Sequence, residues 1–279
     1  MRLESLIVTM DLSNVKMVVT DMDGTLLNSK NEVSGQFFDL YEQLKSHNIK
    51  FVAASGRQYS SIKDKLNSIS EEITIVAENG GYIKQGETEL DSVYLSHENV
   101  QLLLPAVQEV KGLYTVLCGK KAAYIEQNDT KFISILKEYY TQFTVLEDFS
   151  QLPSDEIFKV AIYHFESSEK YIYPVVKHLD SLFQIKISGA NWVDISNPIA
   201  NKGRAVKMLQ DKYGISIDET MVFGDFNNDL EMIDQAFFSY AMSNAHDNVK
   251  KAARFQTKSN NELGVEIILQ DLIASKTGK

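Results

Sequence analysis

Two carboxylates stand two residues apart at the end of an apolar run. Met17–Thr20 is short and β-rich, and Asp21 and Asp23 follow it directly, with Gly24 next. Side chains at positions i and i+2 of an extended segment point the same way, so two such carboxylates repel each other unless a cation joins them. Mg²⁺ prefers hard oxygen ligands of this kind. With a metal and a phosphate present, one carboxylate could act as nucleophile and the other could carry a proton.

Three more apolar runs end in polar residues that could join the same site. The runs are Ile49–Ala54, Ile73–Ala77 and Thr220–Phe223, and the polar residues after them include Ser55, Asn79 and Asp225. In an open parallel sheet, ligands bind beyond the carboxyl ends of the strands, so these side chains are expected to meet. An isolated Asp-x-Asp-Gly could equally be a turn, because turns favour these residues. Its position after a buried strand, together with the other polar strand ends, favours a binding site.

Helical patterns separate these runs. Apolar residues recur with helical spacing after the first two runs, at Phe37, Leu40, Tyr41 and Leu44 and then at Ile62, Leu66 and Ile69. Strands that alternate with amphipathic helices form βαβ units around a parallel sheet. The same alternation returns late in the chain, with a helix that opens at Lys202 and a last helix over Val265–Ile273. The sequence therefore predicts an α/β fold with a Rossmann-like parallel-sheet core.

The pattern is different in the middle of the chain. Strand-like runs cover residues 114–117, 122–126 and 158–165, helical stretches cover 131–140 and 170–182, and a hairpin is expected around Gln85-Gly86-Glu87. This mixture predicts an inserted α+β unit with an antiparallel sheet. We therefore predict a core of residues 1–84 and 194–279 and a cap of residues 85–193.

Composition narrows the classes of partner. The chain has 279 residues and a formal net charge of -10, and it has no block of Lys and Arg of the kind that binds nucleic acid. No apolar run reaches the roughly 20 residues that span a bilayer, and Cys118 is the single cysteine, so a disulfide within the chain is excluded. These features predict a cytoplasmic protein without nucleic-acid or membrane partners. They leave open the oligomeric state and whether translation starts at Met1 or Met10.

The motifs together resemble those of one enzyme superfamily. The four signatures of the haloacid dehalogenase (HAD) superfamily are similar, in order, to Asp21–Leu27, Ala54–Arg57, Lys202 and Gly224–Asp229. The insertion lies between the second and third motifs, where this superfamily carries its type-two (C2B) cap. Asn79–Gly81 and Ala241–Ala245 further resemble the Cof-type subfamily IIB phosphatases, although Ser243 stands where that branch more often has Gly.

The resemblance implies roles for the acidic residues. Asp21 would attack phosphorus and form an aspartyl-phosphate, while Asp23 would protonate the leaving alcohol and then activate water. Lys202 would neutralise phosphoryl charge and orient Asp21. The implied cofactor is Mg²⁺, held by the side chains of Asp21 and Asp225 and by the backbone carbonyl of Asp23, with Asp229 supporting these ligands.

The resemblance also implies phosphate contacts from five residues, which are Thr25, Ser55, Gly56, Arg57 and Asn228. For Arg57 three roles stay open: it could reach the substrate phosphate, reach the cap, or pair with an acid at the rim of the site. No cap residue carries a signature of specificity. The cap aromatics Tyr163, Tyr171 and Trp192 are expected in its core, and the five histidines show no metal-ligand spacing.

The predicted function is hydrolysis of small phosphomonoesters such as sugar phosphates, with nucleotides and pyridoxal phosphate as further candidates. Two alternatives remain from the sequence. A phosphomutase would return the phosphoryl group to a second substrate hydroxyl, and Asp23 serves that chemistry equally well. A binding or regulatory module without catalysis is the other, because a fold alone does not give a function.

Overall fold

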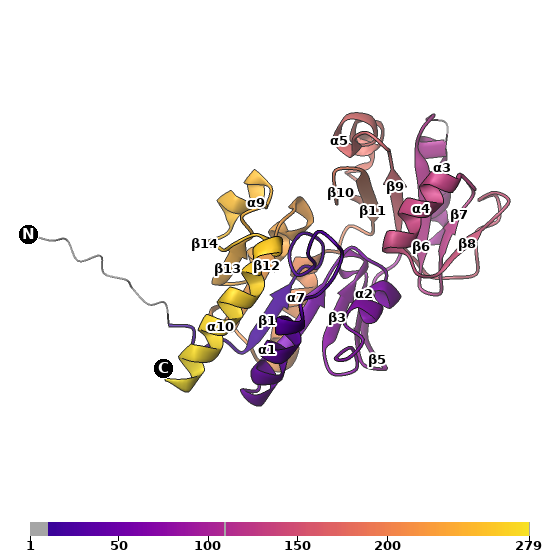
Figure 1. The fold of residues 1–279 in the computed structure, drawn as a ribbon. Coiled ribbons are helices and arrows are strands. Elements are labelled where there is room, and N and C mark those ends of the chain that lie inside the picture. The colour runs from indigo at the N-terminus through magenta and orange to yellow at the C-terminus, as the bar shows by residue number, and fades with distance from the viewer. Residues whose placement is uncertain (1–10, 109, 279) are drawn as a thin grey trace, which may run out of the picture.

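The structure, a computed structural model, describes residues 11–108 and 110–278, which contain two β-sheets with helices packed against them (Figure 1). The first sheet has the order β14-β13-β12-β1-β2-β3-β4-β5. Its strands are β1 (Met17–Thr20), β2 (Lys50–Ala54), β3 (Thr74–Ala77), β4 (Tyr82–Gln85), β5 (Thr88–Ser92), β12 (Thr220–Gly224), β13 (Phe238–Ala241) and β14 (Phe255–Gln256). All pairings from β14 to β3 are parallel, which confirms the predicted α/β core. The choice between Met1 and Met10 falls outside the described residues.

Helices cover both faces of the first sheet. On one face α1 (Gly35–Ser46) packs against α10 (Gly264–Thr277), and on the other α7 (Lys202–Tyr213) packs against α8 (Leu230–Ile233) (Figure 1). The core also contains α2 (Tyr59–Lys65) and α9 (Asp247–Ala252). The apolar stripe that predicts α1 is buried as expected, at Phe37, Leu40, Tyr41 and Leu44. Ser34 caps this helix, because its side chain accepts a hydrogen bond from the N–H of Phe37.

The second sheet is formed by the middle of the chain and has the order β10-β11-β9-β6-β7-β8. Its strands are β6 (Tyr114–Gly119), β7 (Ala123–Ile125), β8 (Phe143–Val145), β9 (Ile157–Tyr163), β10 (Gln184–Ile187) and β11 (Trp192–Ser196). Its helices are α3 (His97–Gln108), α4 (Thr130–Tyr139), α5 (Ser168–Tyr171) and α6 (Tyr173–Val176). All its pairings are antiparallel except that of β7 with β8, in agreement with the predicted insertion.

Strand alternation gives the second sheet two different faces. Val160 of β9 packs in an apolar cluster that includes residues of α3 and α6. Tyr163 of β9 and Trp192 of β11 pack in a separate cluster with residues of α4. Successive side chains of a strand point to opposite faces, so Lys159 and Asp194 lie on the same face as Tyr163 and Trp192. This face therefore carries two charged residues as well as aromatic ones.

Several elements differ from those predicted. The sequence pattern did not indicate α3, β8, β10, β13, α9 or β14; the strands among them have only two to four residues, too few for a clear period. The predicted helix over residues 170–182 is broken into α5, α6 and a 3₁₀ turn, Lys177–Leu179. Pro174 lies at the start of α6 and has no N–H to donate to the preceding turn, which accounts for the break.

The chain also passes from one sheet to the other at positions other than the predicted boundaries, residues 84 and 193. β5 pairs with β4 in the first sheet, and β11 stays in the second sheet as far as Ser196. A change in the alternation of strands and helices marks an insertion, but it does not show which sheet a flanking hairpin joins. We use core for the part with the first sheet and cap for the part with the second, and the connections are residues 93–96 and 197–201.

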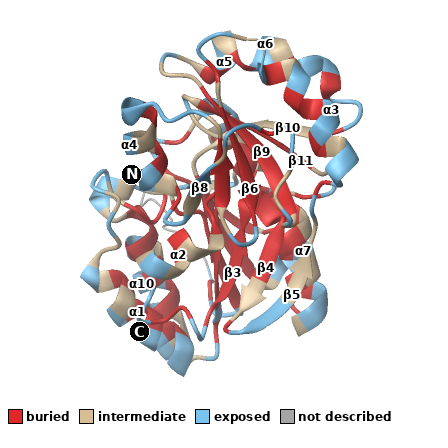
Figure 2. Cartoon of the chain, turned by 90° about the vertical axis from the view of Figure 1, so that its right-hand side faces the viewer, coloured by how far each residue is buried: buried red, intermediate tan, exposed pale blue. Residues whose placement is uncertain are grey.

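Burial follows the two sheets (Figure 2). The strands β1, β3, β9, β11 and β12 are buried along their whole length, whereas the helices expose their outer faces. Among residues 11–108 and 110–278, every helix is too short or too polar to cross a bilayer.

Candidate active site

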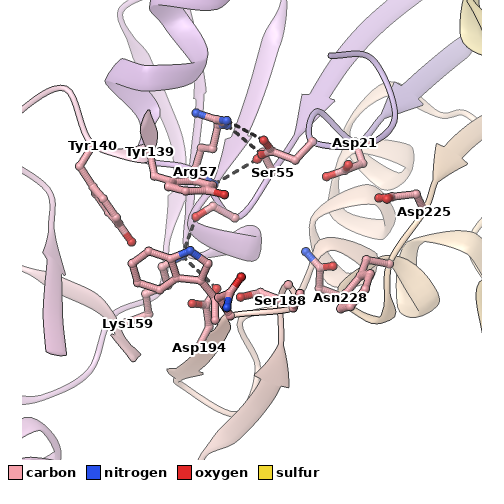
Figure 3. A pocket seen from close by; sticks show the side chains of 18 residues that line it. Asp21, Ser55, Arg57, Tyr139, Tyr140, Lys159, Ser188, Asp194, Asp225 and Asn228 are labelled. Carbon is pink, nitrogen blue, oxygen red and sulfur yellow. Dashed lines mark hydrogen bonds and ion pairs between the residues drawn. The ribbon is translucent and has the colours of Figure 1, made fainter. Parts of the chain in front are cut away.

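A cavity of about 340 Å³ lies where the carboxyl ends of the core strands face the cap (Figure 3). From the core it is lined by Asp21, Asp23, Gly24, Ser55, Gly56, Arg57, Asp225, Phe226 and Asn228. From the cap it is lined by Tyr139, Tyr140, Lys159, the loop Ser188–Trp192 and Asp194. The other predicted residues, Thr25, Lys202 and Asp229, lie deeper and are at most 1% exposed. The structure thus brings four of the predicted strand-end residues, Asp21, Asp23, Ser55 and Asp225, together around one cavity.

Lys202 joins two buried carboxylates beneath the cavity. Its Nζ donates to Oδ1 of Asp21 at 2.6 Å and to Oδ1 of Asp229 at 2.7 Å. Lys202 is the first residue of α7, and the side chain of Asn201 caps this helix by accepting from the N–H of Arg204. The cap fixes where α7 begins, and the start of α7 places the ammonium between the acids.

Asp229 supports the site through both of its carboxylate oxygens. Oδ1 accepts from Lys202, and Oδ2 accepts from the backbone N–H groups of Asp225 at 2.9 Å and of Phe226 at 3.1 Å. Ligand oxygens of Asp21, Asp225 and Asp229 lie within 4.8 Å of one another, a spacing that could hold a metal ion. Because Asp229 already accepts three hydrogen bonds, Asp21 and Asp225 are the better metal ligands.

The charges of this cluster fit a divalent cation. Among residues 11–108 and 110–278, three carboxylates of this group face the ammonium of Lys202, so two negative charges of the group are left without a cation. Burial raises the pKa of Asp21 to about 7, although Lys202 opposes the rise. Burial and repulsion from Asp21 and Asp229 raise the pKa of Asp225 to about 9. Uncompensated buried carboxylates behave in this way, and a dication would supply the missing charge.

Gly24 lets the turn after β1 approach the Asp225 carboxylate. Its φ of +74° lies in the left-handed region, and a Cβ added there would be 2.2 Å from Oδ2 of Asp225. In the same turn, Oγ1 of Thr25 donates to Oδ1 of Asp225 at 3.4 Å. In this structure Thr25 therefore contacts an acid of the cluster and not the cavity.

Arg57 makes contacts that correspond to two of its three predicted roles. Its guanidinium forms a two-pronged ion pair with Asp23, with Nε to Oδ2 at 2.8 Å and Nη2 to Oδ1 at 2.6 Å (Figure 3). Nη1 donates to the backbone carbonyl of Glu138 in α4 of the cap at 2.5 Å, and the ring of Tyr139 lies 4.9 Å from the guanidinium carbon. The side chain of Arg57 is 1% exposed and that of Asp23 is 40% exposed, so the guanidinium end of the pair is buried and the carboxylate end is open to solvent. The side chain of Asp23 is thereby held toward the cavity.

Ser55, Gly56 and Asn228 also line the cavity. Oγ of Ser55 accepts from the N–H of Arg57 at 3.1 Å, which leaves its hydroxyl proton free for a ligand. The side chain of Asn228 donates to Oδ1 of Asn79 at 3.0 Å. Asn79 is not itself in the lining; it lies at the end of β3 in the left-handed conformation, with φ +55°.

The sequence did not single out the charged cap residues Lys159 and Asp194. Nζ of Lys159 donates to the carbonyl of Gly56 at 2.5 Å and to Oδ2 of Asp194 at 3.0 Å. It also lies 3.2 Å from Oε2 of Glu78, whose pKa burial raises to about 7 against the effect of Lys159. The sequence does carry a signal for them, because each is the single charged residue in a largely apolar strand.

The cap aromatics also differ in part from expectation. Tyr163 and Trp192 pack in the apolar core of the cap, as predicted, but Trp192 also lines the cavity. Tyr171 stacks on His164, with ring centroids 4.3 Å apart. Tyr139, at the end of α4, joins Trp192 in an edge-to-face contact and forms part of the same wall.

Comparison with known proteins identifies the family. Residues 18–269 match the family model described as haloacid dehalogenase-like hydrolase. An Escherichia coli protein named 5-amino-6-(5-phospho-D-ribitylamino)uracil phosphatase is 31% identical over 93% of this chain and 97% of its own length. The solved structure of SMU.1108c from Streptococcus mutans has a TM-score of 0.88 at 30% identity and covers 93% of this chain and 99% of its own. A solved subclass IIB sugar phosphatase shares the fold, with a TM-score of 0.81 at 21% identity, covering 92% and 98%.

These matches extend over the core motifs and the cap together. They agree with a parallel-sheet core whose strand ends carry the acids, and with an enzyme of the phosphatase type that the sequence predicts. The chain therefore belongs to the haloacid dehalogenase-like hydrolase family, and it is a phosphoric monoester hydrolase of that family.

Proposed function

We propose that this protein is a Mg²⁺-dependent phosphatase that hydrolyses small phosphomonoesters through an aspartyl-phosphate on Asp21. The observation that carries the proposal is the pair of carboxylates, Asp21 and Asp225, placed beside Lys202 at a cavity that the cap covers. When bound between these carboxylates, Mg²⁺ would neutralise their charge and that of the phosphoryl group. Lys202 would hold Asp21 in position through the hydrogen bond to Oδ1, which leaves Oδ2 for attack.

The first step joins Asp21 to phosphorus. A carboxylate oxygen of Asp21 attacks phosphorus while the bond from phosphorus to the leaving oxygen breaks, and Asp23 gives its proton to that oxygen. The two-pronged pair with Arg57 fixes the direction of the Asp23 carboxylate, and one of its two hydrogen bonds would have to open before Asp23 carries the proton. The hydroxyl of Ser55 and the amide of Asn228 line the cavity and would donate to phosphoryl oxygens.

The second step releases phosphate. Asp23 takes a proton from a water molecule, the water oxygen bonds to phosphorus, and the bond from phosphorus to the Asp21 oxygen breaks, which restores the carboxylate. The cap covers the cavity and would limit the water that reaches the acyl phosphate, as lids do in other enzymes.

A cytoplasmic location remains a prediction of the sequence.

The cavity and the relatives support a proposal for the substrate class. The cap supplies both aromatic and polar groups, including Tyr139, Trp192, Ser188 and Asn191, beside the acids. The Escherichia coli relative is named for a phosphorylated ribitylaminouracil, which has a ring and a chain of hydroxyls. We include that ester and sugar phosphates among the candidate substrates, because both present such groups to a mixed surface.

The proposal is tested with purified protein on p-nitrophenyl phosphate and on a panel of these esters, with Mg²⁺ and with EDTA. We expect phosphate release that requires Mg²⁺ and is lost in Asp21→Asn. The matched control is Asp211→Asn, because Asp211 lies on the exposed side of α7 and pairs only with Lys207 among the described residues. This control is expected to keep wild-type activity.

Other outcomes would separate the alternatives. Conversion of a sugar phosphate to its isomer without phosphate release would replace the phosphatase proposal with a phosphomutase. A folded protein that binds Mg²⁺ but turns over no ester in the panel would favour a binding module. Release that persists in Asp21→Asn would refute Asp21 as the nucleophile.

A further inference from the structure

A row of hydrogen bonds runs from the cap to the phosphate side of the cavity. Lys159 of β9 donates to Oδ2 of Asp194 at 3.0 Å, and the same oxygen accepts from Nδ2 of Asn79 at 2.6 Å. Oδ1 of Asn79 then accepts from Nδ2 of Asn228 at 3.0 Å. All four side chains are at most 8% exposed. The row therefore crosses from two cap strands to two core loops and is largely shielded from bulk water.

The charged end determines the direction of every bond in the row. Lys159 can only donate, and an ionised Asp194 can only accept. Asn79 must therefore turn its NH₂ group toward Asp194 and its carbonyl toward Asn228, which in turn must donate with its own NH₂ group. A neutral group at position 194 would accept or donate, and the amide of Asn79 could then turn over. The carboxylate of Asp194 thus selects which atoms Asn228 can present to a ligand.

The backbone fixes the position of the Asn79 side chain. Its φ of +55° is uncommon for a residue with a side chain, and its N–H donates to the carbonyl of Ser55 at 2.9 Å. Gly56 leaves room for the amide, since a Cβ at Gly56 would lie 3.1 Å from Oδ1 of Asn79. The position of the side chain is therefore fixed by the core, and its orientation is left to Asp194.

We propose that Asp194 and Lys159 are positioning residues that act through Asn79 to orient the amide of Asn228 toward the phosphoryl group when the cap rests on the core, an inference that depends on the proposed function of the site. Lys159 lines the cavity, but its ammonium donates to the Gly56 carbonyl and to Asp194 and lies 3.2 Å from a Glu78 oxygen, so its charge is already matched by two carboxylates of the protein. Both cap residues therefore act on the reaction indirectly.

A double-mutant cycle tests this indirect action. Asp194→Asn, Asn79→Ala and the double variant are compared for kcat/KM on p-nitrophenyl phosphate and for the Kd of inorganic phosphate with Mg²⁺. We expect each single change to weaken both quantities about tenfold, which corresponds to about 1.4 kcal/mol, and the double variant to be no worse than Asn79→Ala. Effects that multiply, or wild-type values for Asp194→Asn, would overturn the proposal.

Lys186→Met is the matched control, because Lys186 of β10 also ties the cap to the core, through an ion pair with Glu231, but lies outside the row. We expect it to keep wild-type kcat/KM and phosphate affinity. A loss equal to that of Asp194→Asn would show that any loosening of the cap has this effect, and would refute a specific role for Asp194.

Two further measurements keep the test decisive. If Asp194→Asn does not fold, the cycle of Asn79→Ala with Asn228→Ala replaces it, since Asn79 should add no loss once Asn228 is absent. If wild type and Lys186→Met release no phosphate from any ester, the proposed function fails. The binding of inorganic phosphate by the same variants then decides the positioning role without turnover.

Discussion

Replacement of Lys202 by methionine removes the one ammonium that, within the described part of the chain, pairs with the carboxylate cluster. The side chain is fully buried, and its Nζ contacts Asp21 at 2.6 Å and Asp229 at 2.7 Å. Methionine has a similar length and no charge, so the change leaves little cavity and mainly alters the electrostatics. The expected loss of stability therefore reports the cost of burying these acids without a cation.

The size of the loss depends on pH. Removal of one partner from a buried ion pair costs about 3–5 kcal/mol, because the other charge stays buried and unpaired. The pKa of Asp21 is about 7 even beside the ammonium of Lys202, and without it the carboxyl would hold its proton to a still higher pH. The folded variant then binds more protons than the unfolded chain, so its stability falls as pH rises. We expect a loss of about 3–5 kcal/mol at pH 8 and a clearly smaller loss at pH 5.

The assay is urea unfolding of the metal-free protein at pH 5 and pH 8, with kcat measured in parallel with Mg²⁺. Loss of a preorganised positive group beside the phosphoryl group is expected to lower kcat by about 10²–10³-fold. Lys207→Met is the control on the same helix, because Lys207 is 56% exposed and pairs with exposed Asp211. Its effect should stay within about 0.5 kcal/mol.

Equal unfolding free energies for Lys202→Met and wild type at pH 8 would refute the argument that the acids need this cation. A loss that is the same at pH 5 and pH 8 would show that packing, and not charge, is what methionine fails to replace. Wild-type kcat would remove Lys202 from the mechanism.

Two more predictions concern the acids and the turn beside them. Gly24→Ala should weaken Mg²⁺ binding more than tenfold, because the new Cβ would displace the Asp225 carboxylate; isothermal titration calorimetry checks this, and unchanged affinity would contradict it. In the folded protein, the pKa values of Asp21 and Asp225 are raised from 3.8 to about 7 and about 9, so the metal-free protein should lose stability as pH rises from about 4 toward 9. Mg²⁺ competes with these protons and should raise Tm more at pH 8 than at pH 5.5, and equal shifts in thermal unfolding scans would argue against it.

Local order along the chain made the core of the site predictable. Asp21 and Asp23 follow β1 directly, and Asp225 and Asp229 follow β12, so a short stretch of sequence contains both the strand and the group at its end. Parallel strands bring their carboxyl ends to one edge of a sheet, and this rule alone joins these acids across about 200 residues of sequence. The resemblance to the HAD superfamily rested on the same short motifs.

Contacts between distant elements could not be predicted in this way. The ion pair of Arg57 with Asp23 depends on the distance between two loops. The contact of Arg57 with the cap depends on the position of a carbonyl in α4. Neither arrangement has a sequence pattern. β5 belongs to the first sheet because it pairs with β4 in a hairpin. The residue pattern of a five-residue strand does not show which sheet the strand joins.

The sequence by itself determined the strand-end acids, the lysine that opens α7 and the order of the motifs, because each depends on neighbours within a few residues. Only the tertiary structure decided that Lys159 and Asp194 lie together on the face of the cap that meets Gly56 and Asn79. That outcome depends on the pairing of β9 with β11 and on the seating of the cap, which bring charges 35 residues apart into one buried row. A buried charge needs a partner, but its own segment does not show which distant residue supplies that partner.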